Sequence, residues 1–335
     1  MAESTYVKAI NAALAQAMRA DPRVIVLGED VAEGGPYLAT EGLADEFGRR
    51  RVLNTPISES AVAGIAVGAA QAGMVPVVEI MFIDFITLAL DQLVNQAAKA
   101  HFMSGGQLRV PMVMRTQGGA GGRAGAQHSQ SLEAWLTHIP GLKVVMPATG
   151  ADAAGLLLSA IADPNPVVFI ENKSLYYRRE TIPDAPEPLP IGRAHTLRRG
   201  RDVTIVALSR MVGEAMTAAE RLAADGIEAE VIDPRTLVPL DLEPIADSVR
   251  RTGRAVVAHE AVRTGGFGGE LAAELQAAAF DYLDAPIQRV GAPFMPVPLS
   301  PTLEDAYRPA AAQIEAAARL AIQWADVTEP VPLRD

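Results

Sequence analysis

Short apolar runs alternate with longer helical patterns along most of the chain. Several of these runs are apolar on both faces, which is typical of parallel strands that helices cover. In the first half of the chain the strand-like runs are residues 24–29, 75–81, 110–116, 142–147 and 166–171. The helical patterns between them lie at about 5–20, 60–72, 84–103 and 150–162. Alternating strands and helices predict an α/β fold with a doubly wound parallel sheet.

The same alternation resumes after a proline-rich stretch. Residues 183–192, PDAPEPLPIG, hold four prolines and no apolar period, which predicts an extended linker. Strand-like runs follow at 203–209, 228–234 and 254–260, separated by helical patterns at about 211–224, 241–251 and 267–280. We therefore predict two doubly wound α/β domains, at residues 1–185 and 201–325. A linker at 186–200 would join them, and a tail at 326–335 would follow the second domain.

The composition of the chain excludes several classes of function. The length of 335 residues suits two domains, and a net charge of −11 argues against nucleic-acid binding, which needs clustered Lys and Arg. The absence of cysteine excludes disulfides, thiolate metal sites and a cysteine nucleophile, and favours a reducing compartment. No apolar run reaches the roughly 18 residues that a membrane span needs, and the first helical pattern does not resemble a signal peptide. We expect a cytoplasmic protein.

The stretch NTPISESAVAGIAVGAAQAG, residues 54–73, predicts an almost wholly apolar helix that Ser58 or Ser60 can cap. Gly64 and Gly68 lie four residues apart on one face, although each glycine costs about 1 kcal/mol relative to alanine in a helix interior. Small residues at this spacing allow another backbone to approach closely. That backbone belongs either to the same chain or to a second subunit.

Glu59 is the only carboxylate in this stretch, and it stands at the start of the helix. Its simplest role is to complement the helix dipole, which contributes about 0.3–1 kcal/mol. The spacing Glu-x4-Gly-Ile-x2-Gly, however, resembles a signature shared by thiamine diphosphate enzymes. In those enzymes a buried glutamate hydrogen-bonds the cofactor's aminopyrimidine and favours the imino tautomer, which then takes the proton from the thiazolium C2. An apolar wall suits this task because a low dielectric strengthens a charge-assisted hydrogen bond.

The resemblance extends along the chain through an ordered set of segments: VIVLGEDV, NTPISE, GIAVGAA, DQLVNQAAK, AQHSQSLEAW, HIPGLKVVMP, LPIGRA, DPRTLVPLDL and HEAVRTGGFGGE. Together they are similar to the β subunit of the two-chain, α2β2 type of 2-oxo acid dehydrogenase E1. This family includes the pyruvate, branched-chain 2-oxo acid and acetoin enzymes. The resemblance implies an N-terminal pyrimidine-binding domain and a C-terminal domain like that of transketolase.

By this resemblance, Glu59 is the aminopyrimidine acid, and Ile57, Met81 and Phe85 line the pocket of the ring. Taken alone, Met81 and Phe85 would be ordinary core residues at helical spacing. Met81 also ends an apolar strand, and ligands bind at the carboxyl ends of strands in doubly wound sheets.

His128 follows a loop with five glycines between Gly118 and Gly125. The loop lacks the Gly-Lys-Ser/Thr element of a Walker motif, so it is either a flexible surface loop or a cradle of another kind. A lone histidine is more often structural than catalytic. The resemblance nevertheless implies that His128 contacts the cofactor and acts as proton donor or orienting group during acyl transfer to a lipoyl group. Imidazole suits that role because it titrates near neutral pH.

The turn after the helical pattern at 150–162 has two interpretations. Asp163, Pro164 and Asn165 form an ordinary helix-ending sequence. In related β subunits the corresponding turn binds a structural potassium ion through main-chain oxygens, which are ligands that suit a hard cation. The resemblance implies as ligands the backbone oxygens of Met112, Ala160, Ile161, Asp163 and Asn165.

The chain contains neither Gly-Asp-Gly nor Asn-Asn, the motif pair that usually holds the magnesium ion and the diphosphate of this cofactor. The resemblance therefore implies half an active site, with the Mg2+ ligands on an α subunit. Single-chain relatives such as transketolase carry both halves.

The leading hypothesis is a pyruvate dehydrogenase E1 β subunit that acts with an α subunit in an α2β2 heterotetramer. It would decarboxylate a 2-oxo acid on thiamine diphosphate and reductively acylate the lipoyl domain of an E2 acyltransferase, whose core would dock on the second domain. An acetoin dehydrogenase E1 β subunit is the alternative within this class. A non-catalytic paralogue acting as a scaffold or regulatory subunit is the alternative outside it.

Overall fold

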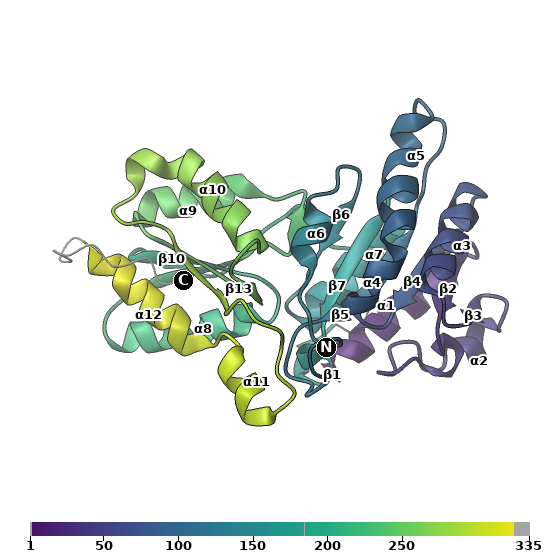
Figure 1. Ribbon diagram of the computed structural model, residues 1–335, viewed down its shortest axis with the longest axis horizontal. Helices are drawn as coiled ribbons and strands as arrows, with labels where there is room; N and C mark the ends of the chain where they lie inside the picture. Colours follow the sequence, from purple (N-terminus) through teal and green to yellow (C-terminus); the bar gives the residue numbers. More distant parts are fainter. Residues whose placement is uncertain (1, 184, 325–335) are drawn as a thin grey trace. The chain divides into compact units, whose positions relative to one another are not determined.

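The computed structural model describes residues 2–183 and 185–324 and contains two compact units (Figure 1). Unit 1 consists of the residues up to Arg193 together with Arg235–Leu240 and Met295–Tyr307. Unit 2 consists of Ala194–Pro234, Asp241–Phe294 and the residues from Arg308 to the end of the described chain. Both are α/β units, as the alternation of strands and helices predicts.

Unit 1 contains a seven-stranded sheet in the order β12-β6-β7-β5-β4-β2-β3. Its strands are β2 (Val24–Gly28), β3 (Val52–Asn54), β4 (Val75–Ile80), β5 (Val113–Gly118), β6 (Lys143–Val145), β7 (Val167–Asn172) and β12 (Thr236–Val238). All pairings are parallel except that of the edge strand β12 with β6. A separate antiparallel pair joins β1 (Ala2–Thr5) to β8 (Arg179–Ile182). The strands β2, β5 and β7 are buried throughout, which explains their apolar runs.

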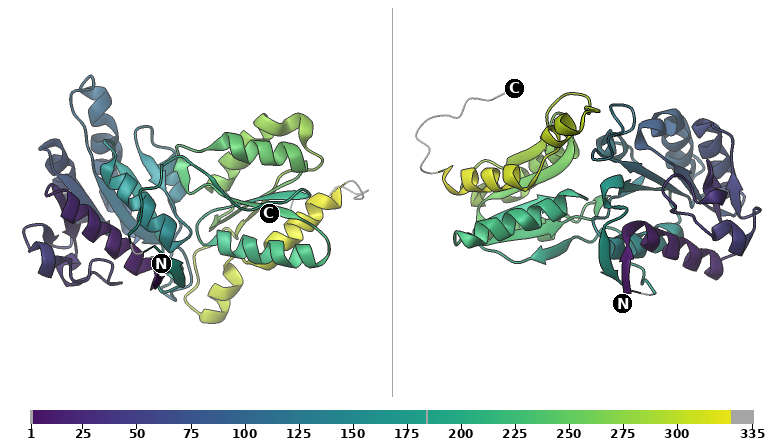
Figure 2. Two further views of the ribbon diagram at one scale, coloured as in Figure 1. Left: turned by 180° about the vertical axis from the view of Figure 1, so that it is seen from behind. Right: turned by 90° about the horizontal axis from the view of Figure 1, so that it is seen from below.

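The helices of unit 1 pack around this sheet, with α1 and α7 side by side (Figure 2). They are α1 (Tyr6–Ala20), α2 (Leu43–Phe47), α3 (Glu59–Gln71), α4 (Ile86–Asp91), α5 (Ala98–Met103), α6 (Glu133–Thr137), α7 (Gly150–Ala162) and α11 (Pro301–Tyr307). Short 3-10 turns are η1 (Val31–Glu33), η2 (Ile83–Phe85) and η4 (Lys173–Leu175). The helix α1 begins at the cap Thr5, whose hydroxyl accepts the N–H of Lys8.

The pattern at 84–103 predicts one helix, and the structure has an unbroken helical run there whose type changes along its length. The turn η2 leads into α4, a π-helical segment η3 (Gln92–Ala97) follows, and α5 completes the run. Asp84 could have capped a helix, but its carboxylate accepts two hydrogen bonds from Gln130 instead. The Asp84 side chain therefore binds the segment around Gln130 and does not cap the helical run.

Unit 2 contains a five-stranded sheet in the order β14-β13-β10-β11-β9, parallel except for β9. Its strands are β9 (His195–Arg198), β10 (Val203–Ala207), β11 (Ala229–Asp233), β13 (Ala255–Val262) and β14 (Gln288–Ala292). Its helices are α8 (Met211–Ala224), α9 (Leu242–Thr252), α10 (Phe267–Ala279), η5 (Phe280–Tyr282) and α12 (Ala311–Ile322). No helix within the described ranges has the length and apolarity that a membrane crossing requires.

The course of the chain differs in detail from the predicted division. The segment expected as linker, 186–200, includes β9, which pairs with β11 of unit 2. Residues 235–240 and 295–307 lie in unit 1, because β12 pairs with β6 and α11 contacts the glycine-rich loop. The predicted tail, 326–335, lies outside the described residues.

Candidate functional site

The candidate site lies along one edge of the sheet in unit 1. Since β2, β3, β4, β5 and β7 run parallel, the segments that follow them leave the sheet at the same edge. Glu29 follows β2, Phe82 lies just beyond β4, the glycine-rich loop follows β5 and Lys173 follows β7. The segment after β3 leads to Glu59. The predicted catalytic residues thus come from loops at the edge where doubly wound sheets bind ligands.

Glu59 is the first residue of α3 and is only 9% exposed. Ser58 occupies the N-cap position without making a capping hydrogen bond. Within the described residues, no group donates a hydrogen bond to the Glu59 carboxylate. Burial and then the Glu59 carboxylate raise the pKa of the neighbouring Glu29. With no donor among the described residues, this largely buried carboxylate can accept a hydrogen bond from a ligand.

His128 belongs to a cluster of aromatic rings. Its imidazole meets Phe82 edge to face, with ring centroids 4.8 Å apart, and meets Phe85 in the same way at 5.3 Å. The ring of Phe82 in turn meets the ring of Tyr37 edge to face, with centroids 6.2 Å apart. The structure thus brings together the predicted residues His128 and Phe85. Sequence reasoning missed Phe82 and Tyr37, although Phe82 lies directly beside the predicted Met81.

Ile57 and Met81 are placed differently from that cluster. Ile57 lies in the segment before α3, and its side chain is 82% exposed. Met81 is half-buried just after β4 and lines a small cavity together with Glu79 and Arg115. Whether these two side chains contact a cofactor ring stays a prediction.

Two side chains hold the segment that carries His128. The Lys173 ammonium donates to the backbone oxygen of His128 and, at 3.2 Å, to the hydroxyl of Ser129. It also lies 5.7 Å from the centre of the Phe82 ring, within reach of a cation–π interaction. Asp84, which is buried, accepts the backbone N–H of Gln130 at 3.2 Å and its side-chain amide at 2.8 Å. These contacts fix the backbone of the histidine and of the two residues that follow it.

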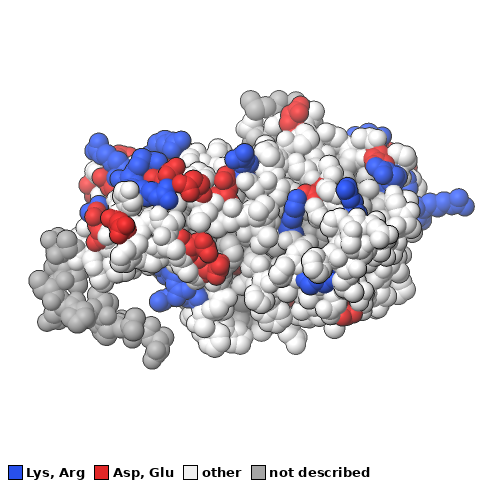
Figure 3. Space-filling model, turned by 90° about the horizontal axis from the view of Figure 1, so that it is seen from above, with Lys and Arg blue, Asp and Glu red and all other residues white. Residues whose placement is uncertain are grey.

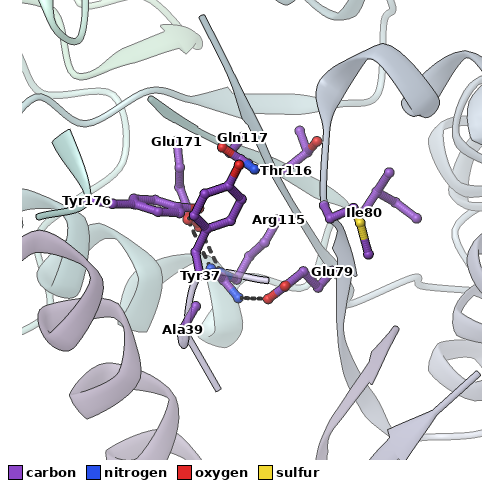
Figure 4. A pocket seen from close by; sticks show the side chains of 10 residues that line it. Tyr37, Ala39, Glu79, Ile80, Arg115, Thr116, Gln117, Glu171 and Tyr176 are labelled. Atoms are coloured by element: carbon purple, nitrogen blue, oxygen red, sulfur yellow. Dashed lines mark hydrogen bonds and ion pairs between the residues drawn. The ribbon is translucent and has the colours of Figure 1, made fainter. Parts of the chain in front are cut away.

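A buried ionic cluster lies beside the rings of Tyr37 and Tyr176 (Figure 4). Arg115 pairs with Glu171 at 2.7 Å and with Glu79 at 2.7 Å, and Tyr176 donates its hydroxyl hydrogen to Glu171. Burial alone would lower the pKa of Arg115, but Glu171 and Glu79 together raise it above its ordinary value. Burial raises the pKa of Glu79 despite the opposing effect of Arg115, and burial and then Glu171 raise the pKa of Tyr176.

The cavity beside this cluster measures about 10 Å³, which is about the room that one water needs. Gln117 and Thr116 line it, and each is only 2% exposed. Among the described residues, neither amide atom of Gln117 nor the hydroxyl of Thr116 has a hydrogen-bond partner. Figure 4 shows both side chains above Arg115 and Glu79. The polar groups on β4, β5 and β7 thus form one buried layer next to the site.

The glycine face of α3 is open in this chain. Among the described residues, a Cβ on Gly68 would meet no atom within 4 Å, and the three atoms nearest to a Cβ on Gly64 all belong to Gln92. Ile65, on the same face, is 57% exposed, and Phe102 at the end of the following helical run is 87% exposed. A second subunit packed on α3 would require an exposed apolar face of the kind that Gly68 and Ile65 form. Elsewhere, too, charged side chains leave wide areas of the surface uncovered in the view from above (Figure 3).

Most of the predicted potassium ligands belong to the last turn of α7 and the turn that follows it. The N–H of Asp163 bonds the carbonyl of Ala160 at 3.3 Å, and the Asp163 carboxylate accepts both N–H groups of Asn165 at 2.9 Å. Lys143 pairs with the other oxygen of this carboxylate. The carbonyl of Met112 accepts the N–H of Val167 at 2.9 Å. A carbonyl oxygen has two lone pairs, so these bonds leave capacity for a cation.

Comparison with known proteins identifies the family. The model of the transketolase pyrimidine binding domain matches residues 2–179, and that of the transketolase C-terminal domain matches residues 192–314. A split-gene transketolase, solved as an inactive β4 tetramer, superposes with a TM-score of 0.78 at 25% identity and covers 95% of this chain and 98% of its own. Transketolase from Leishmania mexicana has a TM-score of 0.71 at 18% identity, covering 99% of this chain and 48% of its own, and shows the fold alone.

The curated relatives are more specific. The β subunit of acetoin:2,6-dichlorophenolindophenol oxidoreductase from Cupriavidus necator is 48% identical, covering 95% of this chain and 98% of the relative. The pyruvate dehydrogenase E1 component subunit β from Rhizobium meliloti is 47% identical, covering 94% and 69%. The corresponding acetoin oxidoreductase subunit of Bacillus subtilis is also 47% identical, covering 90% and 92%. The chain therefore belongs to the transketolase-like family of E1 β subunits of pyruvate and acetoin dehydrogenases, which are oxidoreductase subunits.

Proposed function

We propose that the chain is the β subunit of a thiamine diphosphate-dependent 2-oxo acid dehydrogenase E1, with pyruvate as the first candidate substrate. Together with an α subunit it would decarboxylate the 2-oxo acid and transfer the acyl group to a lipoyl disulfide on E2. The observation that supports this most is the buried, unpartnered carboxylate of Glu59 on the edge of the sheet that also carries His128 and its aromatic neighbours.

The role of each residue follows from its surroundings. Glu59 would hold a hydrogen bond from the aminopyrimidine ring, because its carboxylate is buried and without a donor among the described residues. Phe85 would pack on the same ring, with Ile57 and Met81 completing the wall. The cofactor, when bound, supplies the thiazolium carbon that adds to the oxo group. His128, fixed between Phe82 and Lys173, would donate or orient a proton near the reacting atoms.

The partners follow from the family. The relatives are β subunits by name. We propose an α2β2 heterotetramer in which the α subunit supplies the ligands of Mg2+ and the diphosphate, since this sequence lacks the Gly-Asp-Gly and Asn-Asn motifs. A lipoyl domain and the core of E2 would be further partners. The domain limits 1–185 and 201–325 and a cytoplasmic location stay part of this proposal.

A structural potassium ion is the second component that we propose. Its ligands would be the backbone oxygens of Met112, Ala160, Ile161, Asp163 and Asn165. Ala160 and Ile161 lie in the last turn of α7, where the helix dipole is negative and a carbonyl that accepts one hydrogen bond still has a second lone pair. These oxygen donors fit a hard cation.

Acetoin cleavage is the second candidate function. The chain is 48% identical to an acetoin oxidoreductase β subunit and 47% identical to a pyruvate dehydrogenase E1 β subunit. Sequence identity therefore supports acetoin as a substrate as well as it supports pyruvate. The part of the pocket that holds the acyl group would be shared with the α subunit. Substrate choice therefore depends on both chains.

Reconstitution tests the proposal. The chain is purified alone, then with a candidate α subunit, thiamine diphosphate and Mg2+. Each preparation is assayed with pyruvate, branched-chain 2-oxo acids and acetoin. Activity only in the two-chain preparation is the expected result. Activity of the chain alone would refute the shared site, and no turnover of any substrate by a correctly assembled complex would favour the non-catalytic paralogue.

A further inference from the structure

The glycine-rich loop that precedes His128 has an unusual backbone. Gly119, Gly121, Arg123 and Gly125 all have positive φ, of 87°, 105°, 55° and 74°. Every second residue from 119 to 125 thus lies in the left-handed half of the Ramachandran map, where arginine is uncommon. Alternation of this kind turns successive N–H groups toward one side and forms a nest that binds anions.

The anion in this nest belongs to the protein itself. The Glu304 carboxylate accepts the N–H of Gly121 at 2.9 Å and the N–H of Arg123 at 3.3 Å. The Arg123 guanidinium donates to the same carboxylate at 2.8 Å. Glu304 is completely buried, whereas Arg123 is 38% exposed. The loop therefore does not bind an exogenous phosphate at this point, because a side chain already occupies the nest.

Glu304 comes from far along the chain. It lies on α11 within the segment Met295–Tyr307, which belongs to unit 1 although the chain on either side of it belongs to unit 2. Arg123 also donates to the carbonyl of Pro301 at 2.8 Å and to the Asp305 carboxylate at 2.7 Å. Several hydrogen bonds thus join the segment Met295–Tyr307 to the glycine-rich loop, and the buried carboxylate of Glu304 accepts three of them.

The loop fastened in this way carries His128. Glu304 holds residues 121–123, and Lys173 holds the backbone of His128 a few residues further on. Between them Gly122 packs against the side chain of Lys173, where a Cβ would lie 3.3 Å from its Cε. The imidazole then meets Phe82 at 4.8 Å. The position of the imidazole therefore depends on a loop that has positive φ values at four positions.

We propose that Glu304 is a positioning residue for His128. Its carboxylate is the built-in anion that holds the loop in its left-handed conformation and so presents the imidazole beside Phe82 and Phe85. The catalytic consequence rests on the role proposed for His128. A negative charge is required here because two N–H groups and a guanidinium converge on one buried position, and leaving them without an acceptor is costly.

The test uses the α2β2 complex with three variants: Glu304→Ala, Glu304→Gln and the matched control Asp305→Asn. Asp305 touches the same arginine but is 58% exposed. Hydrogen–deuterium exchange of the amides in 118–130 measures the loop directly, without any turnover. We expect exchange to rise about tenfold or more in Glu304→Ala, by a smaller factor in Glu304→Gln, and hardly at all in the control.

Chemical rescue distinguishes an anion site from general loss of packing. Sodium formate should enter the space left in Glu304→Ala and restore both loop protection and lipoyl acylation, whereas sodium chloride at equal ionic strength should not. Exchange of the cofactor's C2 hydrogen, which depends on Glu59, should stay close to that of the unchanged complex. If Glu304→Ala does not fold, Glu304→Gln carries the comparison.

Two outcomes would overturn the proposal. Loop protection in both Glu304 variants equal to that of the unchanged protein would show that the carboxylate does not hold the loop. A loosened loop with undiminished lipoyl acylation would show that His128 does not depend on it. Failure of the proposed function is a separate result, because an inactive complex with the unchanged sequence would still show the effect on loop exchange.

Discussion

The Arg115 guanidinium donates two hydrogen bonds, of 2.7 and 2.9 Å, to the two carboxylate oxygens of Glu171, and both side chains are 1% exposed. This bidentate pair joins β5 to β7 in the middle of the sheet, and Glu79 on β4 adds a third charge at 2.7 Å. A buried pair of this kind adds little net stability over apolar residues, but removing one partner is strongly destabilising. Three strands next to the site therefore depend on one arginine.

Arg115→Met should destabilise the chain by about 3–5 kcal/mol, because it leaves Glu171 and Glu79 buried without a cation. Urea unfolding followed by circular dichroism measures the change. Arg19→Met is the matched control, since Arg19 makes a similar bidentate pair with Glu46 at the surface, where both side chains are well exposed. The control should unfold almost like the unchanged chain. A similar small effect in both variants would contradict this account of the cluster.

His259 should make unit 2 sensitive to acid. Its imidazole is fully buried, and among the described residues neither ring nitrogen has a partner. Burial and then Arg289 lower its pKa from 6.5 to about 4. As the pH falls below 6.5, His259 binds a proton in the unfolded chain but stays neutral in the folded chain. Stability is therefore retained above pH 6.5 and lost between 6.5 and about 4, by roughly 3 kcal/mol in total.

The variant His259→Gln checks this origin of the pH dependence. Its absolute stability will differ, because Gly266 and Gly268 pack closely on the imidazole. The informative quantity is the slope of the unfolding free energy against pH between 6.5 and 4, measured in urea. The slope should be shallower in the variant than in the unchanged chain. Parallel curves would mean that other groups, mainly carboxylates, cause the whole acid sensitivity.

Gly68→Leu should leave the isolated chain folded but weaken its assembly. The position is exposed, and a Cβ added there would meet no atom of the described residues within 4 Å. If an α subunit packs on this face, leucine will hold the two backbones apart. Co-purification of the α subunit and light scattering of the complex provide the measurement. Thr217→Leu on the exposed face of α8 is the control. Full assembly of Gly68→Leu would exclude this face of α3 as the subunit contact.

Replacing potassium by choline should lower the unfolding temperature of the chain at constant ionic strength, and adding potassium back should restore it by mass action. The Asp163→Ala variant should lose most of this response, because its side chain holds the turn through Asn165 and Lys143. Differential scanning calorimetry at several potassium concentrations measures the effect. An unfolding temperature that does not change with potassium would remove the proposed ion.

The central strands and helices of both units could be predicted from the sequence because their signals are local. Runs that are apolar on both faces, such as the one that became β7, and the periodic run that became α8 need no knowledge of distant residues. Short edge elements gave no such signal. The strand β12, for example, has three residues and pairs antiparallel with β6, so its place depends on tertiary contacts.

Only the residues of the candidate site that belong to recognisable sequence motifs could be predicted. Glu59 and His128 stand in segments with recognisable spacing, and Phe85 proved to contact His128. The partners of Arg115 and the occupant of the glycine-rich loop could not be predicted, because they are set by strand order and by a contact across some 180 positions. A single charged residue in each of three apolar strands was the one available signal for the ionic cluster.

The central claim is that Glu59 activates a pyrimidine whose diphosphate is held by another chain. The most direct test is the exchange rate of the C2 hydrogen of thiamine diphosphate, followed by NMR in the reconstituted two-chain complex with Glu59 or with Glu59→Gln. We predict a rate at least about 100-fold lower in the variant, with assembly unchanged. Equal rates in the two complexes, or rapid exchange by this chain without its α subunit, would contradict the account.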